Sequence, residues 1–267
     1  MKILFAITTA NQLSYTIKII QSIRVHKNKN IDVVIFDDAS NDGTQEWCKK
    51  NNLEIITKKT PEGLTHSWNL AYKKFKNEDY SHLILSNNDL IIPVNAIENL
   101  IEANNKFVIA GPLSTKKGVG HQPLQNVKLY YDINSDEYEY KNTSAIQNVI
   151  SEDTSSKKSK QVDFINGFIF SMDRRIIDYE RSDGNIFDPK NINVGNESEL
   201  CERVKPNIGI ALKAYIFHFK GVSFKDINFD NQPFTHNVYR DLNWQEAEQL
   251  KKNPLKKLLF KLKRKFK

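Results

Sequence analysis

Apolar runs of strand length alternate with helical patterns over the first 110 residues of this 267-residue chain. The expected strands are short and apolar on both faces, which is typical of strands buried between two layers of helices. This alternation predicts an α/β fold with a mostly parallel sheet and right-handed crossover connections. We expect strands at 2–7, 31–36, 53–57, 83–86 and 107–110, and helices at 13–25, from 43 or 44 onward, at 65–75 and at 94–103.

The pattern weakens after residue 110. The stretch 111–160 is polar, with one strand-like piece at 127–133, and its end at 151–160 (SEDTSSKKSK) is predicted to be a mobile surface loop. The sequence therefore predicts one α/β domain up to about residue 250, followed by a separate tail. Regular patterns return at 162–172, and we expect a short helix at 197–204 and strands at 208–212 and 215–219.

The positive charge of the chain is concentrated in this tail. The whole chain carries a net charge of +7, and residues 251–267 contain nine basic residues and no acidic one. Subtracting nine from seven leaves about −2 for the first 250 residues, which argues against a nucleic-acid-binding body. Apolar residues of the tail recur at helical spacing among the lysines, at Leu255, Leu258, Leu259, Leu262 and Phe266.

This amphipathic, basic pattern predicts a helix that lies on an anionic membrane surface. A solvated basic tail or a subunit contact is the alternative. The two cysteines, Cys48 and Cys201, lack metal-site spacing and indicate a reducing compartment. The first expected strand begins at Lys2, which leaves no room for a signal peptide, and no apolar run approaches the ~18 residues of a membrane span. We expect a cytoplasmic location, at the inner face of the membrane where the tail binds lipid.

Three polar residues, Asn87, Asn88 and Asp89, come directly after the expected strand at 83–86. They therefore fall at the carboxyl edge of the sheet, where open α/β folds bind their ligands. One carboxylate beside two amides suits a hard divalent cation that keeps positions open for phosphate oxygens. The alternative is an Asx-rich turn, in which these side chains bond only to their own backbone.

A second acidic site follows the expected strand at 31–36, where Asp37 and Asp38 precede a helix start. A carboxylate there can accept hydrogen bonds from a base N–H and from ribose hydroxyls. One alternative is capping of the helix by the polar residues at 40–42. Another is the phospho-acceptor site of a receiver domain, which would leave the second half of the chain unexplained.

Two further residues of the second half are candidates for chemistry. Glu197 falls near the start of a short helix, where the helix dipole favours a carboxylate that can serve as a general base. His218 ends an aromatic strand and can ligate a metal or a phosphate. First-turn capping for Glu197 and a satisfied, partly buried imidazole for His218 are the alternatives.

Taken in order, these pieces resemble glycosyltransferase family 2, which has the GT-A fold, and within it the rhamnosyltransferase-like branch. The resemblance runs from Lys2 to about Trp244. It implies a nucleotide-sugar-binding half at 1–110 and a smaller acceptor-binding half at 111–250. The segments that carry it are IFDDASNDGT, GLTHSWNLAYKKF leading into LILSNNDLIIP, DFINGFIFSMDRRI, NESELCERV and HFKGVSF.

The resemblance also implies roles for individual residues. Asp89 and His218 fall at metal-binding positions for Mn²⁺ or Mg²⁺, and Glu197 falls at the position of the catalytic base. Asn87 replaces the first acid of the family's Asp-x-Asp motif, and Asn196-Glu197 stands where the family has Glu-Asp. The positions that face the nucleotide are those of Thr8, Thr9, Asp37, Asp38, Asn69 and Asn88.

The activity that follows from the resemblance is a metal-dependent, inverting transfer of a hexose or deoxyhexose. The expected donor is a UDP- or dTDP-sugar, and the expected acceptor is a glycan or a lipid-linked glycan of surface polysaccharide synthesis. A nucleotidyltransferase is a second hypothesis, but it would need a glycine-rich loop with a basic residue where the chain has TTAN at 8–11. A non-catalytic nucleotide-sugar-binding protein is a third hypothesis, which Asn87 favours.

Overall fold

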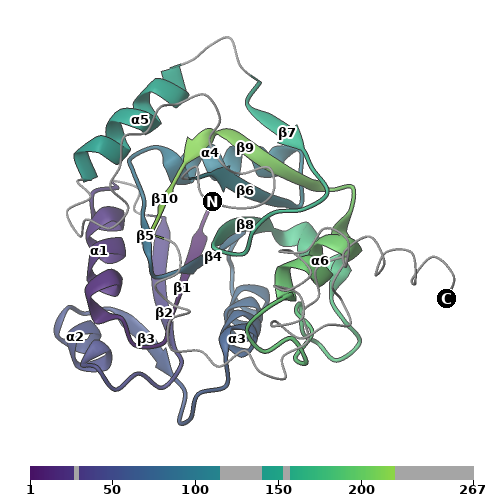
Figure 1. The fold of residues 1–267 in the computed structure, drawn as a ribbon. Coiled ribbons are helices and arrows are strands. Elements are labelled where there is room, and N and C mark those ends of the chain that lie inside the picture. Colours follow the sequence, from purple (N-terminus) through teal and green to yellow (C-terminus); the bar gives the residue numbers. More distant parts are fainter. Residues whose placement is uncertain (27–29, 115–139, 153–156, 220–267) are drawn as a thin grey trace, which may run out of the picture.

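The computed structural model describes residues 1–26, 30–114, 140–152 and 157–219 of the chain (Figure 1). The described residues form a central sheet of eight strands in the order β3-β2-β1-β4-β8-β6-β9-β7, with helices packed around it. The elements of the first half are β1 (Ile3–Thr9), α1 (Leu13–Arg24), β2 (Ile31–Asp37), α2 (Thr44–Lys50), β3 (Glu54–Thr57), α3 (Leu64–Asn77), β4 (His82–Asn87), β5 (Leu90–Ile91), α4 (Ala96–Glu102), η1 (Ala103–Asn105) and β6 (Ile109–Leu113).

The α/β fold predicted from the sequence is confirmed in this first half. Strands β1, β2, β3 and β4 pair in parallel, and the bounds of strands and helices differ from the predicted ones by only a few residues. The register places Thr8 of β1 beside Phe36 of β2 and Asn87 of β4, so the carboxyl ends of three strands meet at one edge.

Both faces of the sheet are buried, as the apolar runs indicate. Leu4 and Ala6 of β1 face one core, which contains Trp68 of α3, whereas Phe5 and Ile7 face a second core on the side of α1 and α4. Successive side chains of a strand point to opposite faces, so a strand with helices on both sides has to be apolar at every position. Because both cores hold β1 in place, the polar residues at its carboxyl end, Thr8 and Thr9, have a fixed position at the edge of the sheet.

The second half departs from the parallel pattern. Strand β8 runs antiparallel to both β4 and β6, whereas β9 runs parallel to β6 and carries β7 antiparallel on its other side. The elements of this half are α5 (Tyr140–Glu152), β7 (Ser159–Gln161), β8 (Ile169–Asp173), η2 (Arg174–Tyr179), α6 (Asn196–Val204), β9 (Ile208–Tyr215) and β10 (Phe217–His218).

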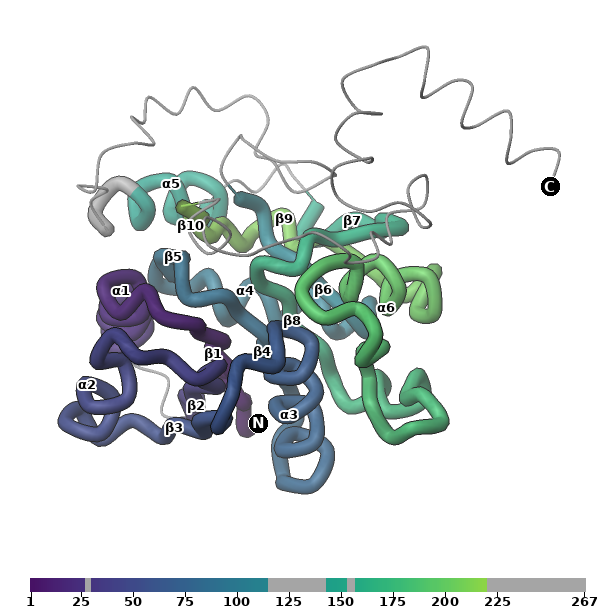
Figure 2. Tube along the Cα trace, turned by 60° about the horizontal axis from the view of Figure 1, so that its bottom comes forward, coloured from purple at the N-terminus to yellow at the C-terminus, as the bar shows by residue number. Residues whose placement is uncertain are grey.

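The prediction of a mobile loop at 151–160 is wrong at both of its ends. Ser151 lies in α5, and Ser159 and Lys160 lie in β7. Polar composition misled the prediction, because α5 packs beside β9 and β10 through a few apolar side chains, among them Ile146 and Ile150 (Figure 2). The strand expected at 127–133 and the tail at 251–267 fall outside the described residues. No helix in the described part of the chain has the length and apolar character that a membrane crossing requires.

Candidate functional site

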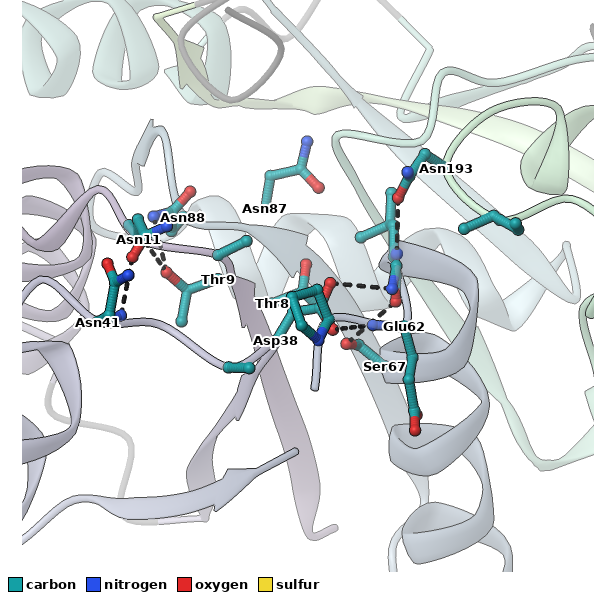
Figure 3. Close-up of a pocket in the computed structure, with 16 residues that line it drawn as sticks. Thr8, Thr9, Asn11, Asp38, Asn41, Glu62, Ser67, Asn87, Asn88 and Asn193 are labelled. Carbon is teal, nitrogen blue, oxygen red and sulfur yellow. Dashed lines mark hydrogen bonds between the residues drawn. The ribbon is translucent and has the colours of Figure 1, made fainter. Parts of the chain in front are cut away.

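A pocket of about 480 Å³ lies where the sequence predicts a ligand site, at the carboxyl ends of β1, β2 and β4 (Figure 3). Its volume falls in the usual range for a small-molecule site, about 300–1,000 Å³. The walls are formed by the segments 8–11, 61–64, 87–88 and 192–193, together with Asp38, Ala39, Asn41 and Ser67.

The end of β4 is held in place by Asn88. The side-chain amide of Asn88 is buried and donates hydrogen bonds to Thr9 Oγ1 and Thr16 Oγ1, each over 3.1 Å. Thr8 and Thr9 both line the pocket, and Thr8 Oγ1 donates to the backbone carbonyl of Ser86 over 3.1 Å. These side chains therefore shape the wall of the pocket through contacts within the protein, and the nucleotide contacts that the resemblance implies for them stay a prediction.

The two neighbouring acids at the end of β2 have different environments. Asp37 is fully buried, and its carboxylate accepts hydrogen bonds from the backbone N–H of Ser40 over 3.2 and 3.3 Å. It does not line the pocket, whereas Asp38 does. Because successive side chains of an extended segment point in opposite directions, only one of the two acids faces the ligand side.

Asp38 is surrounded by hydrogen-bond donors from the turn after β3. One carboxylate oxygen accepts from the backbone N–H of Glu62 over 2.7 Å, and the other accepts from Gly63 over 2.9 Å (Figure 3). The ammonium group of Lys58 lies 2.6 Å from Oδ1 of the same carboxylate. Asp38 thus joins β2 to the turn at 61–64 and still lines the pocket.

Asn69 lies outside this pocket. Its buried side chain accepts hydrogen bonds from the backbone N–H groups of Ile186 and Phe187 and donates one to the carbonyl of Phe187. It lines a separate cavity of about 290 Å³ between α3 and the segment 185–189. From α3, Leu64 and Ser67 line the larger pocket instead.

Ile192 and Asn193 line the pocket from the second half of the chain, and the sequence did not predict them. Asn193 Oδ1 accepts a hydrogen bond from the backbone N–H of Leu64 over 3.0 Å. The hydroxyl of Thr65 donates to the carbonyl of Asn191 and accepts from Asn196 Nδ2 over 3.1 Å. The sequence signal for this segment is weak, because its partners at the start of α3 lie far away in the chain.

The short pairing of β5 with β10 brings Asp89 and His218 together. Leu90 lies opposite His218 in the register, and Asp89 Oδ2 lies 3.2 Å from Nε2 of His218. The imidazole ring stacks on Phe168 with ring centroids 4.9 Å apart. Asp89 is 2% exposed, and its Oδ1 has no hydrogen-bond partner among the described residues.

This pair fits a divalent cation. A buried carboxylate oxygen without a partner is costly unless a cation or a donor occupies the place beside it. A carboxylate and an imidazole are both ligands that Mn²⁺ accepts, and Asn87 and Asn88 directly precede Asp89 in the chain. No group of three histidine, cysteine or acidic side chains is placed to hold a metal ion within the described ranges, so Asp89 and His218 are the two described side chains of these types at this place.

Glu197 is the second residue of α6 and lies beside Gly167. Burial raises the pKa of the Glu197 carboxyl above its ordinary value, and hydrogen bonds from its own backbone N–H and from that of Gly167 oppose the shift. A Cβ on Gly167 would lie 3.2 Å from the carboxyl carbon of Glu197 and 2.8 Å from the ring of Trp68. The next residue, Phe168, accepts a hydrogen bond from the backbone N–H of Asn87 over 2.8 Å, which connects this region to the end of β4.

Comparison with known proteins supplies the family. Residues 5–178 match the family model described as glycosyl transferase family 2. No curated protein sequence matches the chain significantly. Several solved structures share its fold at low sequence identity.

A structure of GalNAc-T7 with UDP, GalNAc and Mn²⁺ is 13% identical, with 82% of this chain and 44% of that chain covered at a TM-score of 0.59. The structure of residues 1–349 of S. aureus TarS is 15% identical, with 82% of this chain and 60% of that chain covered at a TM-score of 0.55. The mannosyltransferase PcManGT from Pyrobaculum calidifontis, in complex with GDP-Man and Mn²⁺, is 12% identical, with 83% of this chain and 58% of that chain covered at a TM-score of 0.53. These likenesses show the GT-A fold, and the chain spans less than two thirds of the length of each of these proteins.

Proposed function

The chain belongs to glycosyl transferase family 2, and from this premise we propose that it transfers a sugar from a nucleoside-diphosphate sugar to an acceptor hydroxyl with inversion. The observation that carries the proposal is the pocket at the carboxyl ends of β1, β2 and β4. Asp38 lies in one wall, and Asn87 lies in another (Figure 3). Two residues after Asn87 comes the buried Asp89, which pairs with His218.

A nucleoside diphosphate would extend through the pocket from Asp38 toward Asn87. The triplet of Asn87, Asn88 and Asp89 supports placing the chain in the rhamnosyltransferase-like branch, with a UDP- or dTDP-linked hexose or deoxyhexose as donor. The solved structures with UDP and with GDP-Man are consistent with a nucleotide-sugar donor, although each ligand belongs to its own protein.

Asp89 and His218 would hold a divalent metal, Mn²⁺ or Mg²⁺. When bound, the metal would neutralise negative charge that develops on the leaving diphosphate. None of the described residues that line the pocket is a lysine or an arginine, so these residues offer no basic side chain to a diphosphate. This composition supports a role for a cation at Asp89.

Glu197 is the proposed general base. A carboxyl with a raised pKa holds a proton more strongly than an ordinary carboxylate, which improves its match to the weakly acidic hydroxyl of an acceptor. In a single displacement, the acceptor oxygen forms a bond to the anomeric carbon as the bond from that carbon to the diphosphate oxygen breaks. The hydroxyl proton moves to Glu197, and attack from the opposite face inverts the anomeric centre.

The proposed acceptor is a glycan or a lipid-linked glycan of surface polysaccharide synthesis. The support comes from the basic, amphipathic tail at 251–267, which would hold the protein at an anionic membrane surface, at the inner face of the membrane. The region 111–250 would contribute the acceptor side. Both regions lie partly or wholly outside the described residues.

Product release from a panel of sugar nucleotides tests the function. We expect release of a nucleoside diphosphate from a UDP- or dTDP-sugar in the presence of Mn²⁺, and more of it when an acceptor glycan is added. A nucleotidyltransferase would instead release pyrophosphate from a nucleoside triphosphate and a sugar phosphate. A binding protein without catalysis would show a ligand-dependent rise in Tm and no release of either product, and this result would contradict the proposal.

A further inference from the structure

A lysine is buried in the wall of the pocket, behind Asp38. The side chain of Lys58 is 6% exposed, and its ammonium group lies 2.6 Å from Asp38 Oδ1. The same group donates a hydrogen bond to the carbonyl of Gly63 over 3.0 Å. A buried ammonium is costly unless it is paired and hydrogen-bonded, so these two partners fix Lys58 at one place in the wall.

These contacts limit what Asp38 can offer to a ligand. A carboxylate has about four acceptor positions, two on each oxygen. On Oδ1 one position is taken by the N–H of Glu62, and Lys58 lies against the same oxygen. On Oδ2 one position is taken by the N–H of Gly63. One acceptor position, on Oδ2, therefore remains for a bound molecule.

The turn that supplies these N–H groups is itself held in place. Gly63 has φ of +87°, and a Cβ on it would lie 2.4 Å from Cγ2 of Ile192. The following N–H, that of Leu64, is bonded to Asn193. The amides of residues 62 and 63 cannot rotate away from Asp38 without disturbing the segment that closes the pocket, so the carboxylate stays restricted when a ligand arrives.

We propose that Lys58 is a positioning residue that restricts Asp38 to one hydrogen bond with the donor base, and that the pocket thereby selects a uracil or thymine nucleotide over a guanine nucleotide. Uracil and thymine present one ring N–H, which a single acceptor position satisfies. Guanine presents a ring N–H and an adjacent amino group, and one acceptor position leaves one of these donors without a partner. An unsatisfied donor in a closed site weakens binding strongly.

The inference rests on the proposed function, since it assumes that the pocket binds the nucleotide of the donor. It adds a residue that does not touch the ligand and a physical reason for the choice of base. Thymine and uracil share the recognised edge, so the restriction on Asp38 does not separate them.

Isothermal titration calorimetry with UDP, dTDP and GDP in the presence of MnCl₂ tests the inference on the full chain. For the unmodified protein we expect UDP or dTDP to bind at least about tenfold more tightly than GDP, the scale of one unsatisfied donor. In Lys58→Met, which keeps the length of the side chain but removes the ammonium group, the Kd for UDP should rise and the ratio of the two affinities should fall toward one.

Two variants separate this role from a general loss of stability. Lys58→Arg keeps the positive charge and should restore part of the preference for UDP. Lys59→Met removes the adjacent exposed lysine and should behave like the unmodified protein. In turnover with a UDP-sugar, Lys58→Met should raise KM and leave kcat nearly unchanged.

Equal binding of GDP and UDP by the unmodified protein would overturn the inference, and this comparison needs no variant. An unchanged preference in a folded Lys58→Met protein would overturn it as well. A protein that binds none of the three nucleotides would overturn the proposed function together with this inference, so the two failures are distinguishable.

Discussion

Two glutamates on α6, Glu197 and Glu199, lie two positions apart in the chain but in different electrostatic environments. Glu199 forms ion pairs with Arg181 over 3.1 Å and with Arg203 over 2.6 Å, so its carboxylate is engaged in contacts within the protein. Glu197 has no such ion pair among the described residues and lies beside Gly167, where burial raises the pKa of its carboxyl. Glu197 does not itself line the pocket. It lies beside Gly167, and the next residue, Phe168, is hydrogen-bonded to Asn87 at the end of β4.

Replacing Glu197 with glutamine should reduce turnover by at least about a hundredfold, the usual scale for the loss of a general base. Donor binding should be retained, because Glu197 is assigned to the acceptor hydroxyl. If Glu197 only capped the helix, the variant would instead lose about 0.5–2 kcal/mol of stability and keep most of its turnover. Turnover and urea unfolding, measured together, distinguish the two roles, and Glu202→Gln on the same helix is the control.

Turnover should also follow the titration of Glu197, because only the ionised carboxylate accepts a proton. Its pKa lies above the ordinary 4.5, so the acid limb of the kcat profile should have its midpoint above pH 4.5. The stability of the fold should respond to pH in the opposite direction. Because the folded protein binds this proton more tightly than the unfolded chain does, protonated Glu197 favours the folded state, and this contribution to the free energy of unfolding is lost as pH rises from the unfolded pKa through the folded one. An acid limb centred at or below pH 4.5 would contradict this assignment.

At the scale of the elements, the segment between η2 and α6 is held to the fold by Arg203. Its guanidinium donates to the backbone carbonyls of Tyr179 and Ile186 and pairs with Glu199. The segment that follows carries Ile192 and Asn193 into the pocket. One side chain of α6 therefore positions a wall of the pocket that lies outside regular secondary structure.

Arg203→Met should destabilise the protein by about 1–3 kcal/mol, because the carbonyls of Tyr179 and Ile186 lose this donor and Glu199 keeps only Arg181 as its ion-pair partner among the described residues. Lys205→Met, which removes a surface pair with Glu202 near the end of the same helix, should change stability by no more than about 0.5 kcal/mol. Urea unfolding of both variants measures the difference. Equal effects of the two substitutions would show that Arg203 does not anchor the segment.

Helices and strands could be predicted from the sequence where neighbouring residues in the chain carry the pattern that specifies them. The apolar runs placed β1, β2 and β4, and the polar residues after them located the edge that forms the pocket. Asn69 fell outside the pocket because its partners, Ile186 and Phe187, are fixed by tertiary packing that no local pattern encodes. The contribution of Asn193 was missed for the same reason.

At the scale of the whole molecule, the charge separates a near-neutral body from a basic tail at 251–267. Deleting the tail should weaken binding to anionic liposomes, because the body has no comparable positive charge. Turnover with a soluble acceptor should stay nearly unchanged. Co-sedimentation with anionic and with neutral liposomes at moderate salt measures the effect, and equal sedimentation of the truncated and full-length proteins would exclude a membrane role for the tail.

The organisation of the whole molecule also joins the two halves of the chain at the proposed metal position. Asp89 follows β4 in the first half, and His218 ends the last described strand in the second. The pairing of β5 with β10 brings them within 3.2 Å, next to the pocket wall formed by Asn87 and Asn88. The central claim is that this junction holds a cation beside a nucleoside diphosphate in the pocket.

Calorimetric titration of UDP with and without Mn²⁺, on the unmodified protein and on Asp89→Ala, tests this claim most directly. Circular dichroism should first establish that the variant is folded. The account predicts that Mn²⁺ strengthens UDP binding to the unmodified protein and that Asp89→Ala abolishes this metal-dependent part. An affinity that is the same in both proteins in the presence of Mn²⁺ would contradict it.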